Sequence, residues 1–298
     1  APLWRAGMRF MGEGGEGNVL VVGGTGRLGG LLGRAWARLG QGGLVWQRRT
    51  GESAGPRFDP LGNPPAYAGA AAGASVILNL AGRVGGSARD DAHHAPLALA
   101  ALRAAREAGV AHVFLASSAS VYGNAPFARE TDAPAPLTGY GRAKAAMEAA
   151  ALAWAAANPG GPRLSLLRIA NVAGADALLA AAPGPGPQML DIFPDGSGPR
   201  RSYLGPMALA GILSRLFAHA RQGGPLPEVL NVALDGAVAM EALLAAAGRD
   251  WAARPAPATA LPVVRLDVTR LAAICGPLPP ADAASIVADL RATLAGAP

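Results

Sequence analysis

The residues best placed to do chemistry are Tyr140 and Lys144, four positions apart at the start of an expected helix. This spacing puts both side chains on one helix face. A nearby ammonium favours the phenolate and lowers the pKa of the phenol, so the tyrosine can exchange a proton near neutral pH. The chain has 25 arginines and one lysine, Lys144. Because a planar, forked guanidinium replaces a compact ammonium poorly, this composition favours a chemical role over a solvated surface pair.

Ser118 ends an expected strand and is the third candidate for catalysis. Strand ends of a parallel sheet face the ligand crevice, where a hydroxyl can hydrogen-bond a carbonyl or alcohol oxygen of a substrate. By itself Ser118 would be interpreted as a turn serine. Together with Tyr140 and Lys144 it forms a catalytic constellation.

A glycine-rich turn is the candidate cofactor site. Gly23, Gly26 and Gly29 follow the spacing G-x-x-G-x-x-G between an apolar strand, 18–22, and a helical pattern that runs through Leu39. Such a turn lets the backbone approach a pyrophosphate, whose charge the helix N-terminus stabilises. The alternative is an ordinary tight turn between strand and helix. The strand–turn–helix context favours dinucleotide binding.

The elements that must position these residues alternate between strand and helix, which predicts an α/β fold with a Rossmann-like, doubly wound parallel sheet. The expected strands are 18–22, 43–47, a short one ending at 58–59, 75–80, 112–116 with 117–118 at its end, and 164–169. The expected helices in this half include 96–108 and 140–157. Beyond Gly174 we expect a loop at 182–187, helices at 206–222, 238–247 and 281–294, and a strand at 229–233.

The domain organisation predicted from this pattern has three parts. Residues 1–17 form a flexible lead-in, and residues 18–174 form the NAD(P)-binding Rossmann domain. A smaller, loop-rich, substrate-binding part spans 175–298.

Several motifs together resemble one family. They are GGTGRLG (23–29), Leu80-Ala81-Gly82, SSASVYG (117–123), YGRAK (140–144), LRIANVAG (167–174), DGSGPRRSY (195–203) and Leu230-Asn231-Val232-Ala233. The chain resembles an extended short-chain dehydrogenase/reductase (SDR) of the NAD-dependent epimerase/dehydratase family over about residues 18–298. The resemblance implies that the strand at about 229–234 returns to the Rossmann sheet.

The resemblance also implies a role for individual residues. Tyr140 would be the general acid/base, Lys144 would bind the nicotinamide ribose and tune Tyr140, and Ser118 would orient the reacting oxygen. Asn171 would lie near the nicotinamide and the substrate, and Asp59 would contact the adenine amino group. The expected cofactor site further includes Gly23, Thr25, Gly26, Arg27, Leu28, Gly29, Leu80, Ala81 and Gly82. The expected substrate contacts are Ser118, Ser120, Asn171 and Arg201.

Three departures from the family pattern restrict the chemistry. Dehydratases of the family typically carry Thr-Asp-Glu where this chain has Ser118-Ala119-Ser120, which disfavours water elimination. His94 stands where the family usually has asparagine, and an imidazole replaces only some of that residue's hydrogen bonds. The acidic residues that usually follow the Arg201 region are replaced by Met207-Ala208.

The end of the second strand predicts a preference for NADP over NAD. NAD-preferring folds place an acid there, about 20 residues beyond the glycine turn, to bind the ribose hydroxyls. This chain has Gln47, Arg48 and Arg49 instead, and its first acid there, Glu52, lies in the following loop. Arg48 and Arg49, with Arg27 from the turn, could pair with a 2′-phosphate. The alternative is two solvated loop arginines.

Composition excludes several other classes of protein. Apolar residues make up 51% and charged residues 15%, which suits a folded core. One cysteine, Cys275, excludes a disulfide framework, and no metal site is expected among four histidines. Although the net charge is +6, the arginines are dispersed, so acidic small molecules or phosphates are more plausible partners than nucleic acid. No apolar run is long enough for a membrane span, and 1–17 lacks the apolar core of a secretory signal. A cytoplasmic location is therefore expected.

The expected function is that of an NAD(P)-dependent oxidoreductase acting on a carbonyl or secondary alcohol of a sugar-derived small molecule. One alternative is a sugar-nucleotide epimerase that retains its cofactor. Another is a dinucleotide-sensing protein without turnover, against which the complete Ser118, Tyr140 and Lys144 set argues.

We also expect a homodimer, because resembling enzymes often pair through the two helices that are alanine-rich here, 96–108 and 140–157. Coding bias is the alternative explanation for this alanine.

Overall fold

The computed structural model describes residues 18–50, 55–82, 92–180 and 186–296. The expected lead-in 1–17, the acid Glu52 and residues 182–185 of the expected loop lie outside the described residues.

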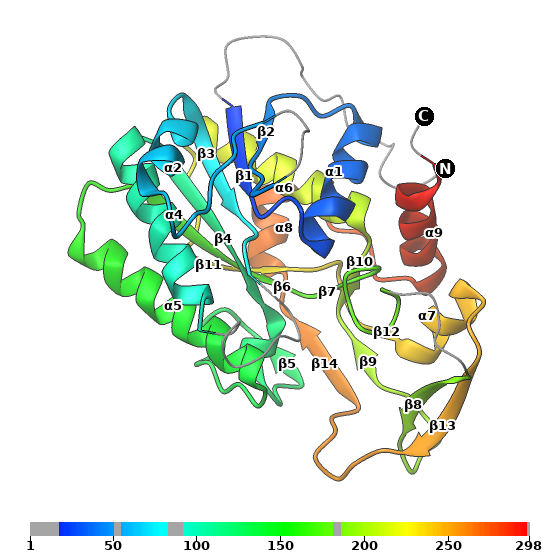
Figure 1. Cartoon of the computed structure of the whole chain (residues 1–298). Coiled ribbons are helices and arrows are strands. Elements are labelled where there is room, and N and C mark those ends of the chain that lie inside the picture. Colours follow the sequence, from blue (N-terminus) through cyan, green and yellow to red (C-terminus); the bar gives the residue numbers. More distant parts are fainter. Residues whose placement is uncertain (1–17, 51–54, 83–91, 181–185, 297–298) are drawn as a thin grey trace.

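A six-stranded, wholly parallel sheet forms the centre of the fold and confirms the predicted fold class (Figure 1). In spatial order its strands are β11 (Val229–Val232), β6 (Arg163–Ile169), β4 (His112–Ser118), β3 (Ala74–Asn79), β1 (Asn18–Val22) and β2 (Leu44–Trp46). The order reverses direction at β1 and β3, which is the switch point where ligands bind in open parallel sheets.

Helices cover both faces of this sheet (Figure 1). One face packs against α1 (Arg27–Leu39), α6 (Pro206–Arg221) and α8 (Thr269–Cys275), and the other against α2 (Pro64–Ala71), α4 (His94–Ala108) and α5 (Gly139–Ala157). Side chains of the strands therefore alternate between two apolar clusters. In β1, Val19 and Val21 belong to the first cluster, and Leu20 and Val22 to the second. Burial on both faces explains why the strands are continuous apolar runs in the sequence.

The expected third strand, ending at 58–59, is wrong. This segment makes a single parallel bridge, between Arg48 and Arg57. The Asp59 carboxylate accepts a hydrogen bond of 3.0 Å from the backbone N–H of Leu61, and Pro60 has no N–H to donate, so the chain turns instead of extending the ladder. The sixth place in the sheet is taken by β11, from a distant part of the chain.

The C-terminal part contains more strands than its sequence predicts. Short pairs join segments far apart in the sequence: β8 (Gln188–Ile192) with β13 (Trp251–Pro255), and β7 (Asn171–Val172) with β10 (Tyr203–Leu204). A four-stranded sheet has the order β12 (Val238–Ala239), β9 (Arg200–Arg201), β14 (Val263–Leu266) and β5 (Phe127–Ala128). The remaining elements are a 3₁₀ turn, η1 (Ala119–Tyr122), and helices α7 (Met240–Ala247) and α9 (Ala283–Leu294).

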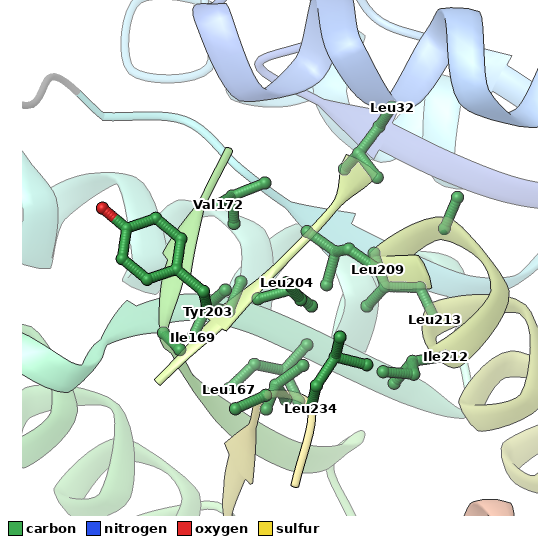
Figure 2. Close-up of a cluster of buried hydrophobic side chains, with 14 of the residues drawn as sticks. Leu32, Leu167, Ile169, Val172, Tyr203, Leu204, Leu209, Ile212, Leu213 and Leu234 are labelled. Carbon is green, nitrogen blue, oxygen red and sulfur yellow. The ribbon is translucent and has the colours of Figure 1, made fainter. Parts of the chain in front are cut away.

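The C-terminal part is joined to the sheet through a shared core. Figure 2 shows aliphatic side chains of α6 (Leu209, Ile212 and Leu213) against side chains of β6 and β10. Asp289 of α9 is a second link, because its carboxylate accepts hydrogen bonds from the first N–H groups of α6, Met207 at 2.8 Å and Ala208 at 2.9 Å. Helix α6 is thus capped by a residue from another helix.

Candidate active site

The glycine turn between β1 and α1 is held by close backbone packing. Gly23 has a φ of +84°, and a Cβ there would lie 2.6 Å from the backbone nitrogen of Ala81. A Cβ on Gly29 would lie 2.6 Å from the carbonyl oxygen of Gly24. Both positions therefore require glycine, and the turn lies directly against the 80–82 segment, another part of the predicted cofactor site.

The first turn of α1 suits an anion. Its N-cap is Gly26, no described side chain caps it, and its first turn contains no acid. The N–H groups at this end therefore remain available to a pyrophosphate. The Arg27 side chain donates a hydrogen bond of 3.3 Å to the carbonyl oxygen of Ala175, across the crevice. These features fit the predicted dinucleotide.

The Gln47 side chain holds the glycine turn in place. Its side chain is 3% exposed. Its Oε1 accepts a hydrogen bond of 3.1 Å from the Gly23 N–H, and its Nε2 donates one of 2.6 Å to the carbonyl oxygen of Phe58. Since both ends of the amide are used, Gln47 positions the glycine turn through its side chain.

Arginines lie beside Gln47 at the end of β2. Arg48 is half-buried and pairs through its backbone with the exposed Arg57, while Arg49 is exposed. The Arg48 Nε is buried and has no hydrogen-bond partner among the residues described.

The predicted catalytic residues share one cavity of about 480 Å³ with the glycine turn. Ser118, Ser120, Tyr140, Lys144 and Asn171 all line it. From the predicted cofactor set, Gly23, Gly26, Arg27, Leu28, Gly29, Leu80 and Gly82 line it as well. Thr25, Gln47, Arg48, Arg49, Asp59 and Ala81 are outside its lining, and Arg201 lines a neighbouring groove that also includes Asn171.

Lys144 is buried beneath Tyr140. Its Nζ donates a hydrogen bond of 2.6 Å to the carbonyl oxygen of Ala116 and lies 5.8 Å from the centre of the Tyr140 ring. Burial lowers the pKa of Lys144 to about 8, although the nearby Glu148 carboxylate raises it. An ammonium has three donors, so this bond to β4 leaves two for other acceptors.

Hydroxyl groups and an imidazole complete the wall around Tyr140. The Ser118 Oγ accepts a hydrogen bond of 3.1 Å from the Ser120 N–H and donates one of 3.0 Å to the Ser120 Oγ. The His94 ring, buried at the start of α4, meets the Tyr140 ring edge-on with 5.6 Å between centroids. His94 also lies under Gly82, where a Cβ would approach the imidazole to 2.5 Å.

A buried ion pair behind the cavity was missed by the sequence analysis. Glu148, one helical turn after Lys144, pairs with Arg168 of β6 at 2.7 Å, and both side chains are under 5% exposed. Glu148 also accepts a hydrogen bond of 2.5 Å from the Ser117 hydroxyl. The available signal was a lone acid in the alanine-rich helix and an arginine inside an apolar strand. Because isolated buried charges are costly, each of these residues required a partner.

Comparison with known proteins agrees with this geometry. Residues 19–185 match the model of the NAD dependent epimerase/dehydratase family. The chain belongs to this family. It is accordingly an enzyme of the extended SDR type that uses a nicotinamide dinucleotide. No protein with curated annotation is similar enough to the sequence to match it.

Several solved structures share the fold of this chain. MoeE5 in complex with UDP-glucuronic acid and NAD has a TM-score of 0.72 at 22% identity, covering 93% of this chain and 99% of that one. A UDP-glucose-4-epimerase from Stenotrophomonas maltophila with bound NAD and formylated UDP-arabinopyranose has a TM-score of 0.73 at 21% identity, covering 94% and 98%. TunA, an NAD dependent NDP-hexosamine 5,6-dehydratase, has a TM-score of 0.67 at 19% identity, covering 93% and 97%.

The part of the chain that the structure describes has neither a membrane-spanning helix nor a metal-binding cluster. No helix there is both long and apolar enough to span a bilayer. No group of three or more His, Cys, Asp or Glu side chains in these segments is arranged to hold a metal ion.

The buried Lys144 predicts that cofactor affinity depends on pH. The ammonium is retained below a pKa of about 8 and lost as the pH rises through it, and a neutral amine binds ribose hydroxyls and phosphates less well. We expect the affinity of Tyr140→Phe for NADPH to be constant near pH 7 and to fall above pH 8, by at most about tenfold per unit for one linked proton. Fluorescence titration measures this, and Tyr140→Phe removes the phenol as a second titrating group. An unchanged affinity up to pH 9.5, or the same decline in Lys144→Gln, would contradict the assignment.

Proposed function

We propose that the chain catalyses NAD(P)-dependent hydride transfer at a carbonyl or secondary alcohol of a sugar-derived small molecule. The observation that carries this proposal is the buried Lys144 ammonium beneath Tyr140, in one cavity with Ser118 and the glycine turn. This cavity brings a proton-transfer group to the same crevice as a pyrophosphate site.

Each residue has a separate task in this proposal. Tyr140 gives a proton to a substrate carbonyl oxygen or takes one from an alcohol. The Lys144 ammonium stabilises the phenolate and binds ribose hydroxyls, and its bond to Ala116 fixes its position. Ser118, itself oriented by Ser120, holds the reacting oxygen. When bound, the nicotinamide supplies or accepts the hydride.

An epimerase is the second candidate, favoured by the similarity to structures of UDP-glucose 4-epimerases. Such an enzyme would use the same three residues and keep its cofactor while one carbon is oxidised and reduced again. Cofactor that copurifies with the protein would favour it. A dehydratase is disfavoured because Ala119 and Ser120 provide no acid beside Ser118. A non-catalytic sensor would bind cofactor and turn over no substrate on a broad panel.

We further propose that NADP is preferred over NAD. Gln47 takes the place of the acid that would bind ribose hydroxyls, and its amide is already used by the turn. Arg48, with a buried Nε that has no partner among the described residues, lies beside Arg49 and Arg57. A 2′-phosphate would compensate this positive charge, and a 2′-hydroxyl would not.

Tyr140→Phe tests the proposed mechanism. Loss of the proton donor should lower turnover ~10²–10⁴-fold and leave cofactor affinity nearly unchanged. A panel of carbonyl and sugar substrates, followed at the nicotinamide absorbance with both cofactors, provides the assay. The matched control is Tyr67→Phe, which removes a buried hydroxyl outside the cavity lining that makes no hydrogen bond to the described residues. A Tyr140→Phe rate within threefold of the wild type would exclude Tyr140 from the mechanism.

The cofactor preference has a direct binding test. NADPH should bind at least about tenfold more tightly than NADH, or ~1.4 kcal/mol. Titration of both cofactors at low and moderate salt measures this preference. Arg48→Ser and Arg49→Ser should reduce it, whereas Arg103→Ser, an exposed arginine on α4, should not. Equal affinities, or tighter binding of NADH, would refute the preference and favour the epimerase.

We also propose a homodimer formed through α4 and α5. Ala146, Ala149, Ala153 and Ala156 are exposed on α5 at helical spacing, so a second copy could approach closely. A cytoplasmic location and the lack of a nucleic-acid partner stay predictions from the sequence.

Light scattering at micromolar concentration tests the dimer. The wild type should have twice the mass of the chain, and Ala153→Glu should be monomeric because it places a charge in the interface. Ala37→Glu makes the same change on α1, on the opposite face of the sheet, and should leave the dimer intact. A monomeric wild type would contradict the proposal.

A further inference from the structure

The buried ion pair of Glu148 and Arg168 lies behind the active-site cavity and has no task in the mechanism proposed above. Two guanidinium nitrogens of Arg168 donate to the carboxylate, Nη2 at 2.7 Å and Nε at 3.1 and 3.2 Å to its two oxygens. Neither side chain lines the cavity, so the pair can act on the reaction only through other residues. A purely stabilising role is a weak explanation, because apolar side chains of similar volume often replace buried ion pairs without loss of stability.

A further contact of Glu148 is with the part of β4 that carries the reacting groups. The Ser117 hydroxyl donates a hydrogen bond of 2.5 Å to the Glu148 Oε1. Ser117 lies between Ala116, whose carbonyl oxygen accepts a hydrogen bond from Lys144, and Ser118, which lines the cavity. The carboxylate therefore ties the end of β4 to the helix that carries both Tyr140 and Lys144.

Arg168 completes this arrangement from the neighbouring strand. Ser117 of β4 and Arg168 of β6 are partners in the parallel register, and both direct their side chains to Glu148 of α5. The carboxylate is thus held by two strands of the sheet, and one helical turn separates it from Lys144.

The charge of Glu148 matters because Lys144 is buried. Burial lowers the pKa of Lys144 to about 8, and the Glu148 carboxylate raises it. The described elements packed around Lys144 bring five titratable side chains to this region: Tyr140 and Glu148 on α5, His94 on α4, Tyr122 on η1 and Arg168 on β6. Glu148 is the one carboxylate of this set, so it is the group that can favour the ammonium.

We propose that Glu148 is a positioning residue of the active site, which keeps the Lys144 side chain charged and fixes it, together with Ser118, around Tyr140. Replacing Glu148 by a neutral residue would leave Lys144 near an unpaired guanidinium, which favours the neutral amine. Replacing Arg168 would leave the carboxylate, which favours the ammonium. The inference rests on the proposed function, because that function gives the ammonium its task of stabilising the phenolate and binding ribose.

Lys144 is the single lysine of the chain, so its charge can be measured directly. Full-length protein labelled with ¹³C-lysine gives one ε-carbon signal, whose chemical shift follows the protonation of the amine. Without cofactor, the midpoint of this titration should lie near the pKa of about 8 that burial gives Lys144. Glu148→Gln should lower the midpoint by at least about one pH unit. Arg168→Gln breaks the same ion pair and should not lower it.

Two further variants complete the experiment. The double variant Glu148→Leu with Arg168→Met keeps the test available where a single variant does not fold, because it leaves no unpaired charge. It removes the carboxylate, so its midpoint should fall below that of the wild type. The matched control is Glu107→Gln, the same change at an exposed position of α4, which should leave the midpoint in place. In the Tyr140→Phe background, Glu148→Gln should also move the decline in NADPH affinity to lower pH.

Two results would overturn the inference. One is an unmoved midpoint in the variants without Glu148, and the other is an equal fall in Glu148→Gln and Arg168→Gln, which would show that the pair only stabilises the fold. The titration requires neither cofactor nor substrate, so it is independent of the turnover assay. A Tyr140→Phe rate close to that of the wild type would count against the proposed function, while the midpoints would still decide whether Glu148 keeps Lys144 charged.

Discussion

The burial of one ammonium, that of Lys144, is the constraint on which the site depends. A buried charge must be compensated, and here the Ala116 carbonyl oxygen accepts a hydrogen bond of 2.6 Å from the ammonium, while the Glu148 carboxylate opposes the fall in the pKa of Lys144. Glu148 is buried in turn and requires Arg168 and the Ser117 hydroxyl. Keeping Lys144 charged next to Tyr140 therefore requires particular side chains on β4, β6 and α5, namely Ser117, Arg168 and Glu148.

This polar network continues across the sheet into the C-terminal part. The Arg168 guanidinium lies 4.6 Å from the ring centre of Tyr122, whose hydroxyl donates a hydrogen bond of 2.7 Å to Asn231 of β11. The Asn231 amide donates to the carbonyl oxygens of Ala128 and Asp267. The edge strand β11 and the segments that follow it are thus fixed by the same polar groups that extend from behind the cavity. Truncating Glu148 or Arg168 would leave the other charge buried and uncompensated, which typically lowers the free energy of unfolding by about 3–5 kcal/mol.

Gln47 stands where the fold usually has an acid, and this replacement affects both the glycine turn and the choice of cofactor. An amide can accept from Gly23 and donate to Phe58 at once, whereas a carboxylate could only accept. The glycine turn is therefore tied to the segment after β2 as well as to Ala81. The same replacement leaves no acid in the sequence beside Arg48 and Arg49 at the end of β2, which is the basis of the proposed NADP preference.

The sequence by itself determined what local periodicity and spacing encode. The apolar runs predict all six strands of the parallel sheet, and one further strand, ending at 58–59, that the structure lacks. The spacings of Gly23, Gly29, Tyr140 and Lys144 predict a turn and a helix face that the structure contains. Only the tertiary structure decided which distant groups meet. The pairing of Glu148 with Arg168, the contact of Asp176 with Tyr203 and the pairing of β8 with β13 all join positions well separated in the chain. Such contacts follow from how the layers pack, because a hydrogen bond or ion pair depends on distances of a few ångströms that no local pattern specifies.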